Sequence, residues 1–268
     1  MHQDNISKHE KPIEEVYTSG EFWDDLPDFL AWQAPGKIRH LSRFIDFDLI
    51  LRSLPNPNRC VIADIGCGAG LVSTGLAEHL RKQYPNVSFE VYGYDLSPQA
   101  IDVAKKALAP NAHFECKRFE NADMIWDFAI LCDVIEHVED PYEFVRNAAL
   151  KSRYFVVGYA MDDNLANRMD KKRHAVVNSV GHISLFHEKR ALDVSGKYGD
   201  IIASSYIRNP FLRNFVVKKF LHVFTSPIKF VLQCLSPRIK GKIFGGESIF
   251  ILTKSRIFNS SFKAHSDK

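Results

Sequence analysis

The chain has 268 residues and a net charge of +3, with 46% hydrophobic and 25% charged residues, values that suit one or two α/β domains with a buried core. No run of about 18 uncharged apolar residues occurs, and the polar start lacks the apolar core of a signal peptide, so we expect neither a simple membrane span nor secretion. Five cysteines without a CxxC pair argue against a disulfide framework or a zinc site and favour a cytoplasmic protein with buried, reduced thiols.

Along the chain, short apolar runs alternate with helical patterns. Residues 1–57 are rich in aromatic side chains and are predicted to form helices that pack outside a sheet. The predicted strands are 60–65, 89–94, 113–116, 127–132, 154–159, 200–207 and 247–253. The predicted helices are 71–83, 98–108, 141–150 and 188–197, of which the second and third have Ser97 and Asp140 as N-caps. Such alternation predicts a parallel sheet with right-handed crossovers.

The first predicted strand runs into a glycine-rich turn, VIADIGCGAG, residues 61–70. A phosphate loop of the form GxxxxGK[ST] is absent, and the dinucleotide fingerprint GxGxxG would need a third glycine at position 71, which is Leu71. The second predicted strand ends at Asp95, where an acid can accept hydrogen bonds from both ribose hydroxyls of an adenosyl ligand. The turn and the acid together favour a ligand site over a turn that only allows close packing.

Four stretches resemble one known family, the class I S-adenosylmethionine-dependent methyltransferases, over about residues 58–205 and the last strand. ADIGCGAG is similar to the first motif of that family and GYDLSPQAI to its second-strand motif. DFAILCDVIEHVEDP and GHISLFHEKRAL resemble the fourth-strand motif and a later histidine loop of its quinone and small-molecule branch. The resemblance implies a doubly wound, mostly parallel, seven-stranded sheet with an antiparallel last strand, and S-adenosylmethionine as cofactor.

The resemblance also implies which residues hold this cofactor, since they follow the predicted strands. They are Asp64, Gly66, Gly68, Gly70, Asp95, Leu96, Glu120 and Cys132. One position departs from the family pattern: Lys117 and Arg118 stand where an acid usually receives the adenine amino group. Glu120 or the backbone near Phe119 is the expected substitute.

A second group of candidate residues follows the fourth predicted strand. Asp133, Glu136 and His137 are spaced to share one face of a helical turn, and His182 comes from a later loop. Three interpretations stay open. Glu136 and His137 support the cofactor loop structurally; His137 or His182, beside Asp133, is a catalytic general base; or all four residues hold a divalent metal, as the resemblance suggests.

The predicted organisation is capping helices at 1–57, the cofactor-binding core at 58–207, a basic apolar insertion at 208–246, and a final strand with a loose tail at 247–268. Residues 208–242 contain eight lysines and arginines and no acid, whereas the remainder has 27 basic and 32 acidic residues. This segment either packs on the body or another copy, touches an anionic inner membrane surface or lipid-linked acceptor, or contacts nucleic acid. Residues 161–174, which follow the fifth predicted strand, are predicted to form a charged, solvated loop over the acceptor site.

The predicted activity is O-methylation of a small-molecule, glycan or lipid-linked acceptor. The alternatives are a nucleic-acid methyltransferase and a cofactor-binding module without catalysis. A nucleic-acid partner is not expected, because the basic segment is rich in apolar residues and the chain has no recognised RNA-binding module. The sequence predicts no oligomeric state.

Overall fold

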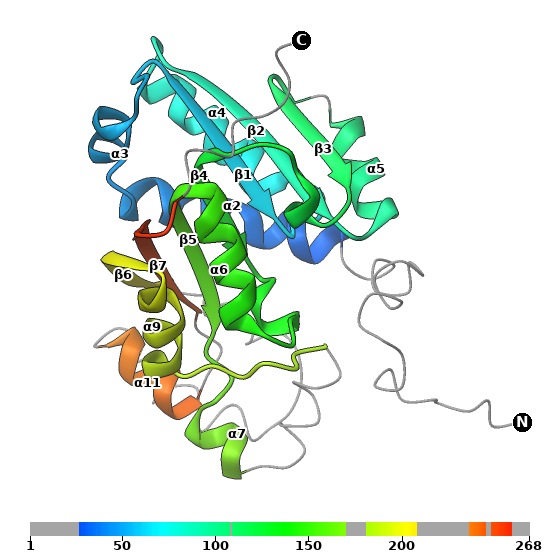
Figure 1. The fold of residues 1–268 in the computed structure, drawn as a ribbon. Coiled ribbons are helices and arrows are strands. Elements are labelled where there is room, and N and C mark those ends of the chain that lie inside the picture. Colours follow the sequence, from blue (N-terminus) through cyan, green and yellow to red (C-terminus); the bar gives the residue numbers. More distant parts are fainter. Residues whose placement is uncertain (1–26, 108, 170–180, 208–235, 245–247, 259–268) are drawn as a thin grey trace, which may run out of the picture.

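The computed structural model describes residues 27–107, 109–169, 181–207, 236–244 and 248–258, which form a single central sheet with helices around it (Figure 1). The seven strands lie in the order β3-β2-β1-β4-β5-β7-β6. Their bounds are β1 Arg59–Ile65, β2 Ser88–Asp95, β3 Ala112–Cys116, β4 Trp126–Cys132, β5 Ser152–Ala160, β6 Gly199–Ile207 and β7 Ser248–Ser255.

Strands β1 to β5 are parallel to one another, and β7 runs antiparallel to both β5 and β6. This arrangement confirms the predicted doubly wound sheet with an antiparallel last strand. The strand order reverses between β1 and β4, so the carboxyl ends of these two strands border the crevice where sheets of this kind bind ligands.

Most predicted helices are found within a few residues of their expected bounds. The helices are α2 Pro27–Phe44, α3 Phe47–Ser53, α4 Leu71–Gln83, α5 Pro98–Lys106, α6 Pro141–Lys151, α7 Leu165–Met169, α9 Glu188–Lys197 and α11 Pro237–Phe244, with two short 3-10 turns, η1 Phe119–Asn121 and η2 Ile135–His137. Both predicted N-caps are present, because Ser97 accepts the N–H of Ala100 and Asp140 accepts those of Tyr142 and Glu143. In contrast, the N-cap residue of α4 is Gly70, which offers no side-chain cap.

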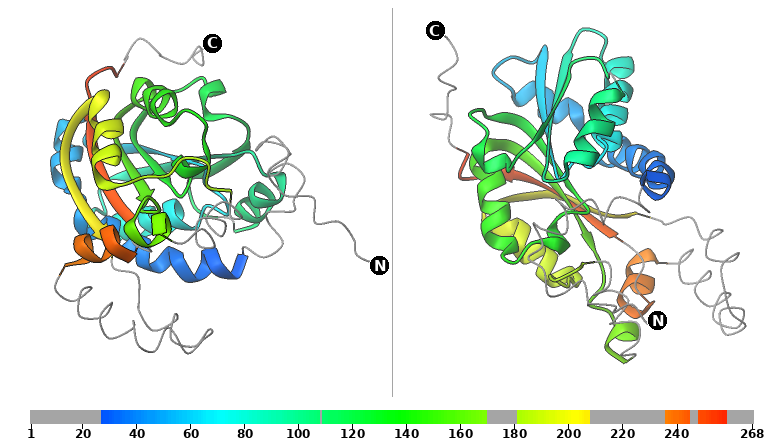
Figure 2. Two further views of the ribbon diagram at one scale, coloured as in Figure 1. Left: turned by 90° about the horizontal axis from the view of Figure 1, so that it is seen from below. Right: turned by 90° about the vertical axis from the view of Figure 1, so that its right-hand side faces the viewer.

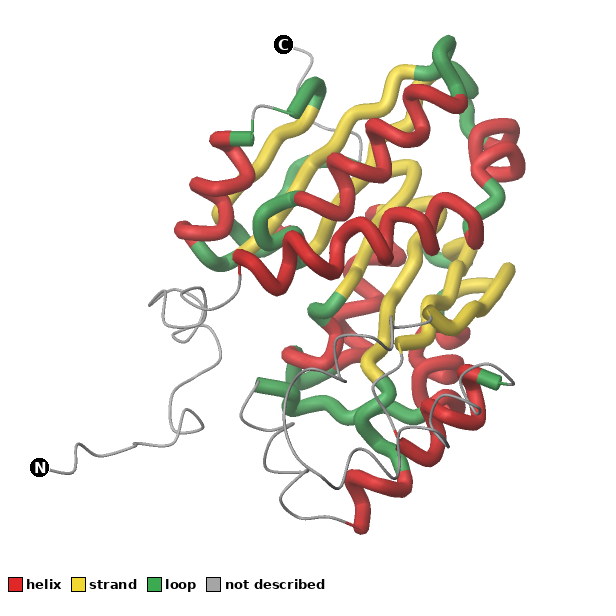
Figure 3. The backbone as a smooth tube through the Cα atoms, turned by 180° about the vertical axis from the view of Figure 1, so that it is seen from behind, coloured by secondary structure: helices red, strands yellow, loops and turns green. Residues whose placement is uncertain are grey.

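Helices cover both faces of the sheet. Helices α6 and α9 lie over the face seen in Figure 1, and α2 and α4 over the face seen from behind in Figure 3. Because side chains alternate along a strand, β1 contributes to the hydrophobic core on each face of the sheet. Ala63 belongs to the cluster that contains Val145, and Ile62 belongs to the cluster that contains Leu41 and Leu76. Burial on both faces explains why the strands read as continuous apolar runs.

Two short helices lie outside this frame. Helices α7 and α11 contact each other beyond the carboxyl end of β5 (Figure 2). Of the 208–246 segment, α11 is described and residues 208–235 lie outside the described part of the chain. No described helix combines the length and the apolar character needed to cross a membrane.

Candidate active site

The glycine-rich turn after β1 needs glycine at each of its three positions. Gly66, Gly68 and Gly70 have φ angles of 71°, 52° and 69°, which residues with a side chain rarely adopt. The Gly66 N–H donates to the carbonyl of Tyr94 at 2.8 Å, which ties the turn to the end of β2. A Cβ on Gly66 would lie 2.6 Å from Cγ2 of Val134. The turn therefore presents bare backbone and is closely packed from the loop after β4.

Asp95 joins this turn to the end of β2. Its Oδ2 accepts the N–H of Gly68 at 2.8 Å, and its Oδ1 accepts the N–H of Ser97 at 2.9 Å. Burial raises the pKa of Asp95, and these backbone donors act in the opposite direction. A carboxylate has about four acceptor positions, so it can also accept from the hydroxyls of a ligand. Leu96 follows Asp95 and is half-buried.

Asp64, the last acid of β1, has a buried oxygen that lacks a donor. The residue is only 3% exposed, and within the described part of the chain its Oδ2 has no hydrogen-bond partner. Burial raises its pKa to about 6, although hydrogen bonds from Ser73 lower it. Buried acceptors are normally satisfied, so this oxygen is suited to a donor on a ligand, and a cationic one would also favour its ionised form.

In the loop after β4, one expectation from the sequence is wrong. Asp133 does not share a helical face with Glu136 and His137, because its φ of 54° turns the chain before the 3-10 turn η2 begins. Its carboxylate instead forms an ion pair with Lys37 of α2. Cys132, just before it, is buried, and burial raises its thiol pKa to about 12.

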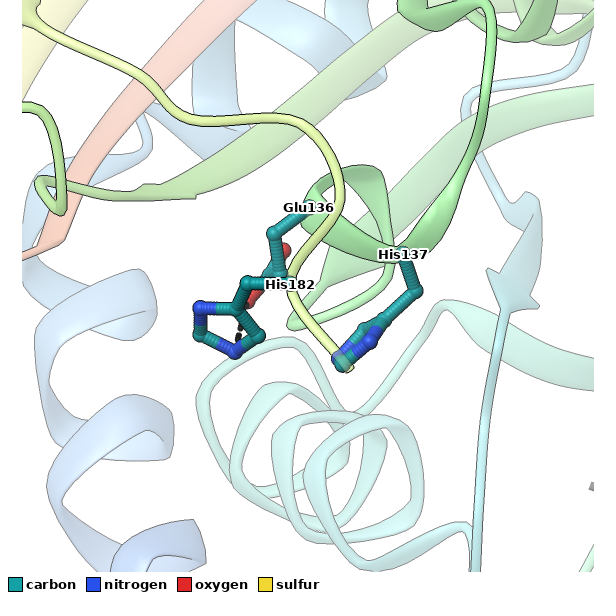
Figure 4. Close-up of side chains that lie close together, drawn as sticks. All are labelled: Glu136, His137 and His182. Carbon is teal, nitrogen blue, oxygen red and sulfur yellow. Dashed lines mark ion pairs between the residues drawn. The ribbon is translucent and has the colours of Figure 1, made fainter. Parts of the chain in front are cut away.

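Glu136, His137 and His182 do come together (Figure 4). One ligand-capable atom from each lies within 4.8 Å of the others, and the two imidazole ring centroids are 4.9 Å apart. Glu136 is 3% exposed, and among the described residues its Oε2 has no hydrogen-bond partner. Its backbone carbonyl accepts the N–H groups of Ile183 and Ser184, which fixes the histidine loop against η2.

The two histidines differ in protonation. Burial, followed by the neighbouring His182, lowers the pKa of His137 to about 4, so His137 is neutral and its Nδ1 at 3.0 Å from the Gly181 carbonyl acts as a donor. For His182, burial alone would lower the pKa, but the hydrogen bond to Asp162 and the charges of Glu136 and Asp162 outweigh it and raise the pKa. His182 is therefore the member of the pair whose pKa is raised above the usual 6.5.

Sequence reasoning missed two residues of this site. Asp162 was expected in a solvated loop, but its Oδ2 lies 2.6 Å from Nδ1 of His182, so this expectation was wrong for Asp162. Its position two residues after β5, at the carboxyl edge of the sheet, was the available signal. Lys37 had no comparable signal, since only packing of α2 brings it to Asp133.

No described side chain is clearly placed for the expected contact with adenine. Glu120 lies half-buried in η1, and its backbone carbonyl accepts a hydrogen bond from Lys151 at 2.7 Å. Phe119 is buried in the core against Trp126 and Phe144. Lys117, which stands near the place of the usual acid, pairs with Glu115 at 2.8 Å. An adenine contact from Glu120 stays a prediction.

Comparison with known proteins identifies what this arrangement resembles. The family model described as a methyltransferase domain matches residues 37–194, more than half of the chain. The ubiquinone biosynthesis O-methyltransferase of Coxiella burnetii (strain Dugway 5J108-111) is 29% identical over 126 residues, which are 44% of this chain and 50% of that protein. The mitochondrial ubiquinone biosynthesis O-methyltransferase of Saccharomyces cerevisiae is 33% identical over 92 residues, 32% of this chain and 28% of that protein. The alignments thus span half or less of these relatives.

The fold is also similar to that of solved structures. Magnesium protoporphyrin IX methyltransferase from Synechocystis PCC 6803, crystallised with bound SAH, superposes with a TM-score of 0.53 at 16% identity. The match covers 90% of this chain and 97% of that one. At this identity the likeness is one of fold.

Proposed function

Because the chain belongs to the methyltransferase-domain family, as the match over residues 37–194 shows, we propose that it transfers a methyl group from S-adenosylmethionine to a hydroxyl of a small-molecule acceptor. The observation that carries this proposal is the convergence of the glycine turn, Asp64 and Asp95 at the carboxyl ends of β1 and β2. This set offers bare backbone and two carboxylates but no phosphate-binding lysine loop, which suits a ligand with a ribose and an ammonium group.

The residues present fit this cofactor. Asp95 would accept from the ribose hydroxyls and Asp64 from the α-ammonium, while Gly66 to Gly70 would lie against the methionine part. When bound, the cofactor supplies a methyl group activated by a sulfonium. The protein then contributes mainly alignment, which supplies much of the rate gain in a displacement of this kind.

An oxygen acceptor favours a general base, and His182 is the best candidate for it. Asp162 at 2.6 Å would accept the Nδ1 proton, so Nε2, which lies 4.0 Å from Oε1 of Glu136, would take the proton of an acceptor hydroxyl. His137 has its Nδ1 engaged by Gly181 and is the weaker base, because its pKa is lowered to about 4. Asp133 would act indirectly, since its carboxylate is paired with Lys37.

A divalent metal at Glu136, His137 and His182 is a second candidate arrangement. Two observations favour it: the ligand-capable atoms approach one another within 4.8 Å, and Oε2 of Glu136 has no partner among the described residues. Mixed oxygen and imidazole ligands suit zinc or manganese. Here the metal, not His182, would lower the pKa of the acceptor hydroxyl. Treatment with EDTA, followed by addition of single divalent ions, separates the two arrangements. Activity that EDTA does not change excludes the metal and leaves His182 as the base.

Calorimetry with S-adenosylhomocysteine tests the cofactor assignment. Asp95→Ala removes the charged acceptor of the ribose, and the net loss of one hydrogen bond to a charged group, worth about 1.5–3 kcal/mol, is expected to weaken binding by at least roughly 10- to 100-fold. Asp102→Ala, an exposed acid on α5, is the matched control and is expected to bind normally. Unchanged affinity in Asp95→Ala removes this residue from the site, and tight binding of NAD in place of the homocysteine compound contradicts the proposed function.

The acceptor and location are further proposals. A small-molecule acceptor is favoured by the resemblance in sequence to the ubiquinone O-methyltransferases, and a lipid-linked one by the basic, apolar segment 208–242. Within that segment Arg238 and Lys242 both pair with Glu188, which supports packing on the body for the α11 part.

Sedimentation with anionic liposomes at low and high salt tests membrane contact. The variant in which Lys218, Lys219 and Lys229 are changed to Glu should bind the liposomes less. The cytoplasmic location stays a prediction.

A further inference from the structure

Lys151 is a buried cation to which the assignments above give no function. It is the last residue of α6 and is 6% exposed. Its Nζ donates to the carbonyl of Glu120 at 2.7 Å and to that of Ala122 at 2.5 Å, so it holds the turn η1 and the residue after it. Burial lowers its pKa, while the charges of Asp123 and Glu120 act in the opposite direction. A buried ammonium is costly unless its donors are satisfied, and here backbone carbonyls of one turn satisfy them.

Helix α6 fixes η1 at a second point as well. The ring of Phe144 packs edge-on against the ring of Phe119, with the centroids 5.1 Å apart. Phe119 is 3% exposed, and its ring centroid is 6.4 Å from that of Trp126. The apolar contact and the two hydrogen bonds of Lys151 together fix the backbone of η1 against α6.

The side chain of Glu120 is the part of η1 that the protein leaves without a partner. Glu120 is half-buried, and among the described residues its carboxylate has no hydrogen bond or ion pair. A carboxylate that is partly shielded from water is stabilised by a donor, and such hydrogen bonds to an ionised group are strong. The Glu120 carboxylate is therefore suited to a donor on a ligand.

The place of η1 along the sheet indicates which part of the ligand reaches it. The strands β1, β2 and β3 are neighbours in that order, and Asp95 of β2 is paired in register with Cys116 of β3, three residues before η1 begins. A ligand with its ammonium at Asp64 and its ribose at Asp95 crosses β1 and then β2. The next segment in this direction is η1, so the base on the ribose is the part that meets Glu120.

We propose that Lys151 is a positioning residue for the choice of base, because it fixes η1 so that the Glu120 carboxylate receives the amino group of adenine. The proposal rests on S-adenosylmethionine being the cofactor. An ionised carboxylate is only an acceptor, so it is complementary to an amino group and disfavours an oxo group at the same ring position. Lys151 thus acts through Glu120 on the selectivity for the cofactor.

The test compares two probes by calorimetry. S-adenosylhomocysteine carries the amino group, and S-inosylhomocysteine has an oxo group in its place. We expect the unmodified protein to bind the adenine probe roughly 10- to 100-fold more tightly, as one hydrogen bond to a charged group allows, and Glu120→Ala to reduce this preference below about threefold. Lys151→Met keeps a long side chain without donors. It should weaken the adenine probe by at least about fivefold and change the inosine probe by less than about twofold.

Arg146→Met is the matched control, since Arg146 is an exposed residue of the same helix and pairs with Glu143. It should keep the preference of the unmodified protein. A merely structural effect of Lys151→Met would not change the preference, because a smaller competent fraction weakens both probes alike. If Lys151→Met does not fold, Lys151→Gln, which keeps donors at a shorter reach, takes its place with the same expected result.

Two kinds of result overturn the proposal. One is a preference in the Lys151 variant or in Glu120→Ala that is as large as in the unmodified protein. The other is an unmodified protein that binds both probes equally well. If the unmodified protein binds neither probe, the proposed function itself fails, which is a different result.

Discussion

At the scale of single residues, Gly66 lies where β1 ends and the chain turns toward α4. Its φ of 71° and the 2.6 Å that would separate a Cβ at this position from Val134 are two independent reasons for glycine. The same distance shows that the loop after β4 lies directly against the glycine turn.

We therefore predict that Gly66→Ala lowers the free energy of unfolding by about 1–3 kcal/mol. Val134→Ala should recover only part of this loss, because it removes the 2.6 Å contact with Cγ2 but leaves the contact with Cβ at 2.8 Å and the positive φ. Urea unfolding of both single variants and the double variant measures the coupling. Gly36→Ala is the control, since a Cβ there meets nothing within 4 Å and an alanine in helix α2 should be neutral or stabilising. Additive effects of Gly66→Ala and Val134→Ala would contradict the argument.

His182 gives a prediction about pH. As a base it must be neutral, so activity should fall as the pH drops below its pKa, which Asp162 and Glu136 raise above the usual 6.5. Asp162→Asn removes one of these charges and should move the acidic limb of the rate profile to lower pH, with a lower maximum rate because the ring loses its orientation. A profile of kcat against pH for both proteins provides the measurement, and an unmoved acidic limb excludes His182 as the titrating base.

The hydrogen bond between His182 and Asp162 also makes the free energy of unfolding depend on pH. Because the folded pKa of His182 is raised, its contribution to stability is fully present below about pH 6.5 and is lost as the pH rises through the folded value. In Asp162→Asn, the free energy of unfolding should lack this pH-dependent contribution. Glu139→Gln, on the exposed side of the same loop region, provides a control for loss of an acid.

At the scale of elements, α11 is fixed to the body by one largely buried acid. Glu188 at the start of α9 pairs with Arg238 at 2.7 Å and with Lys242 at 3.0 Å, and its side chain is 13% exposed. Burial alone would raise the pKa of Glu188, but the two cations outweigh this and lower it. The pairs are therefore present above the ordinary carboxyl pKa and are lost as the pH falls through the folded value.

We predict that Glu188→Gln loosens α11. With roughly 1 kcal/mol lost from the two partly exposed pairs, amide exchange of residues 238–244 should become about fivefold faster. Hydrogen exchange with mass spectrometry measures this. Glu143→Gln on α6 breaks a comparable but fully surface pair with Arg146 and should leave α11 unchanged. Equal exchange of α11 in all three proteins would show that apolar packing on α7 and β6 alone holds it.

At the scale of the whole molecule, the site is assembled from distant segments. The turn after β1, the end of β2, the loop after β4, Asp162 and His182 all lie at one edge of the sheet, where α2 contributes the ion pair of Lys37 with Asp133. A ligand held by so many segments should stabilise the fold as a unit, because it binds the folded state alone.

S-adenosylhomocysteine at one hundred times its Kd is expected to stabilise the folded protein by about 2.7 kcal/mol. For a domain of this size that corresponds to a rise in Tm of about 5–10 °C. Differential scanning calorimetry over a ligand series measures it, with NAD as the comparison compound. A Tm that is independent of ligand concentration would contradict binding to the folded state.

The sequence by itself determined the sheet, most helices and the cofactor turn. Buried parallel strands read as apolar runs, caps such as Ser97 and Asp140 act locally, and the positive φ angles at Gly66, Gly68 and Gly70 require glycine wherever the rest of the chain lies. These signals lie within a few residues of the feature that they specify, so a linear reading finds them.

Only the tertiary structure decided which charged groups meet. Lys37 and Asp133 are 96 residues apart, and Asp162 and His182 are 20 apart, with no spacing rule that connects either pair. The sequence placed Asp133 with Glu136 and His137 on a helical turn, and the left-handed backbone at Asp133 separated them. The physical reason is that Coulomb and hydrogen-bond energies depend on distance in space and on burial, and both are set by how α2 and the later loop pack on the sheet.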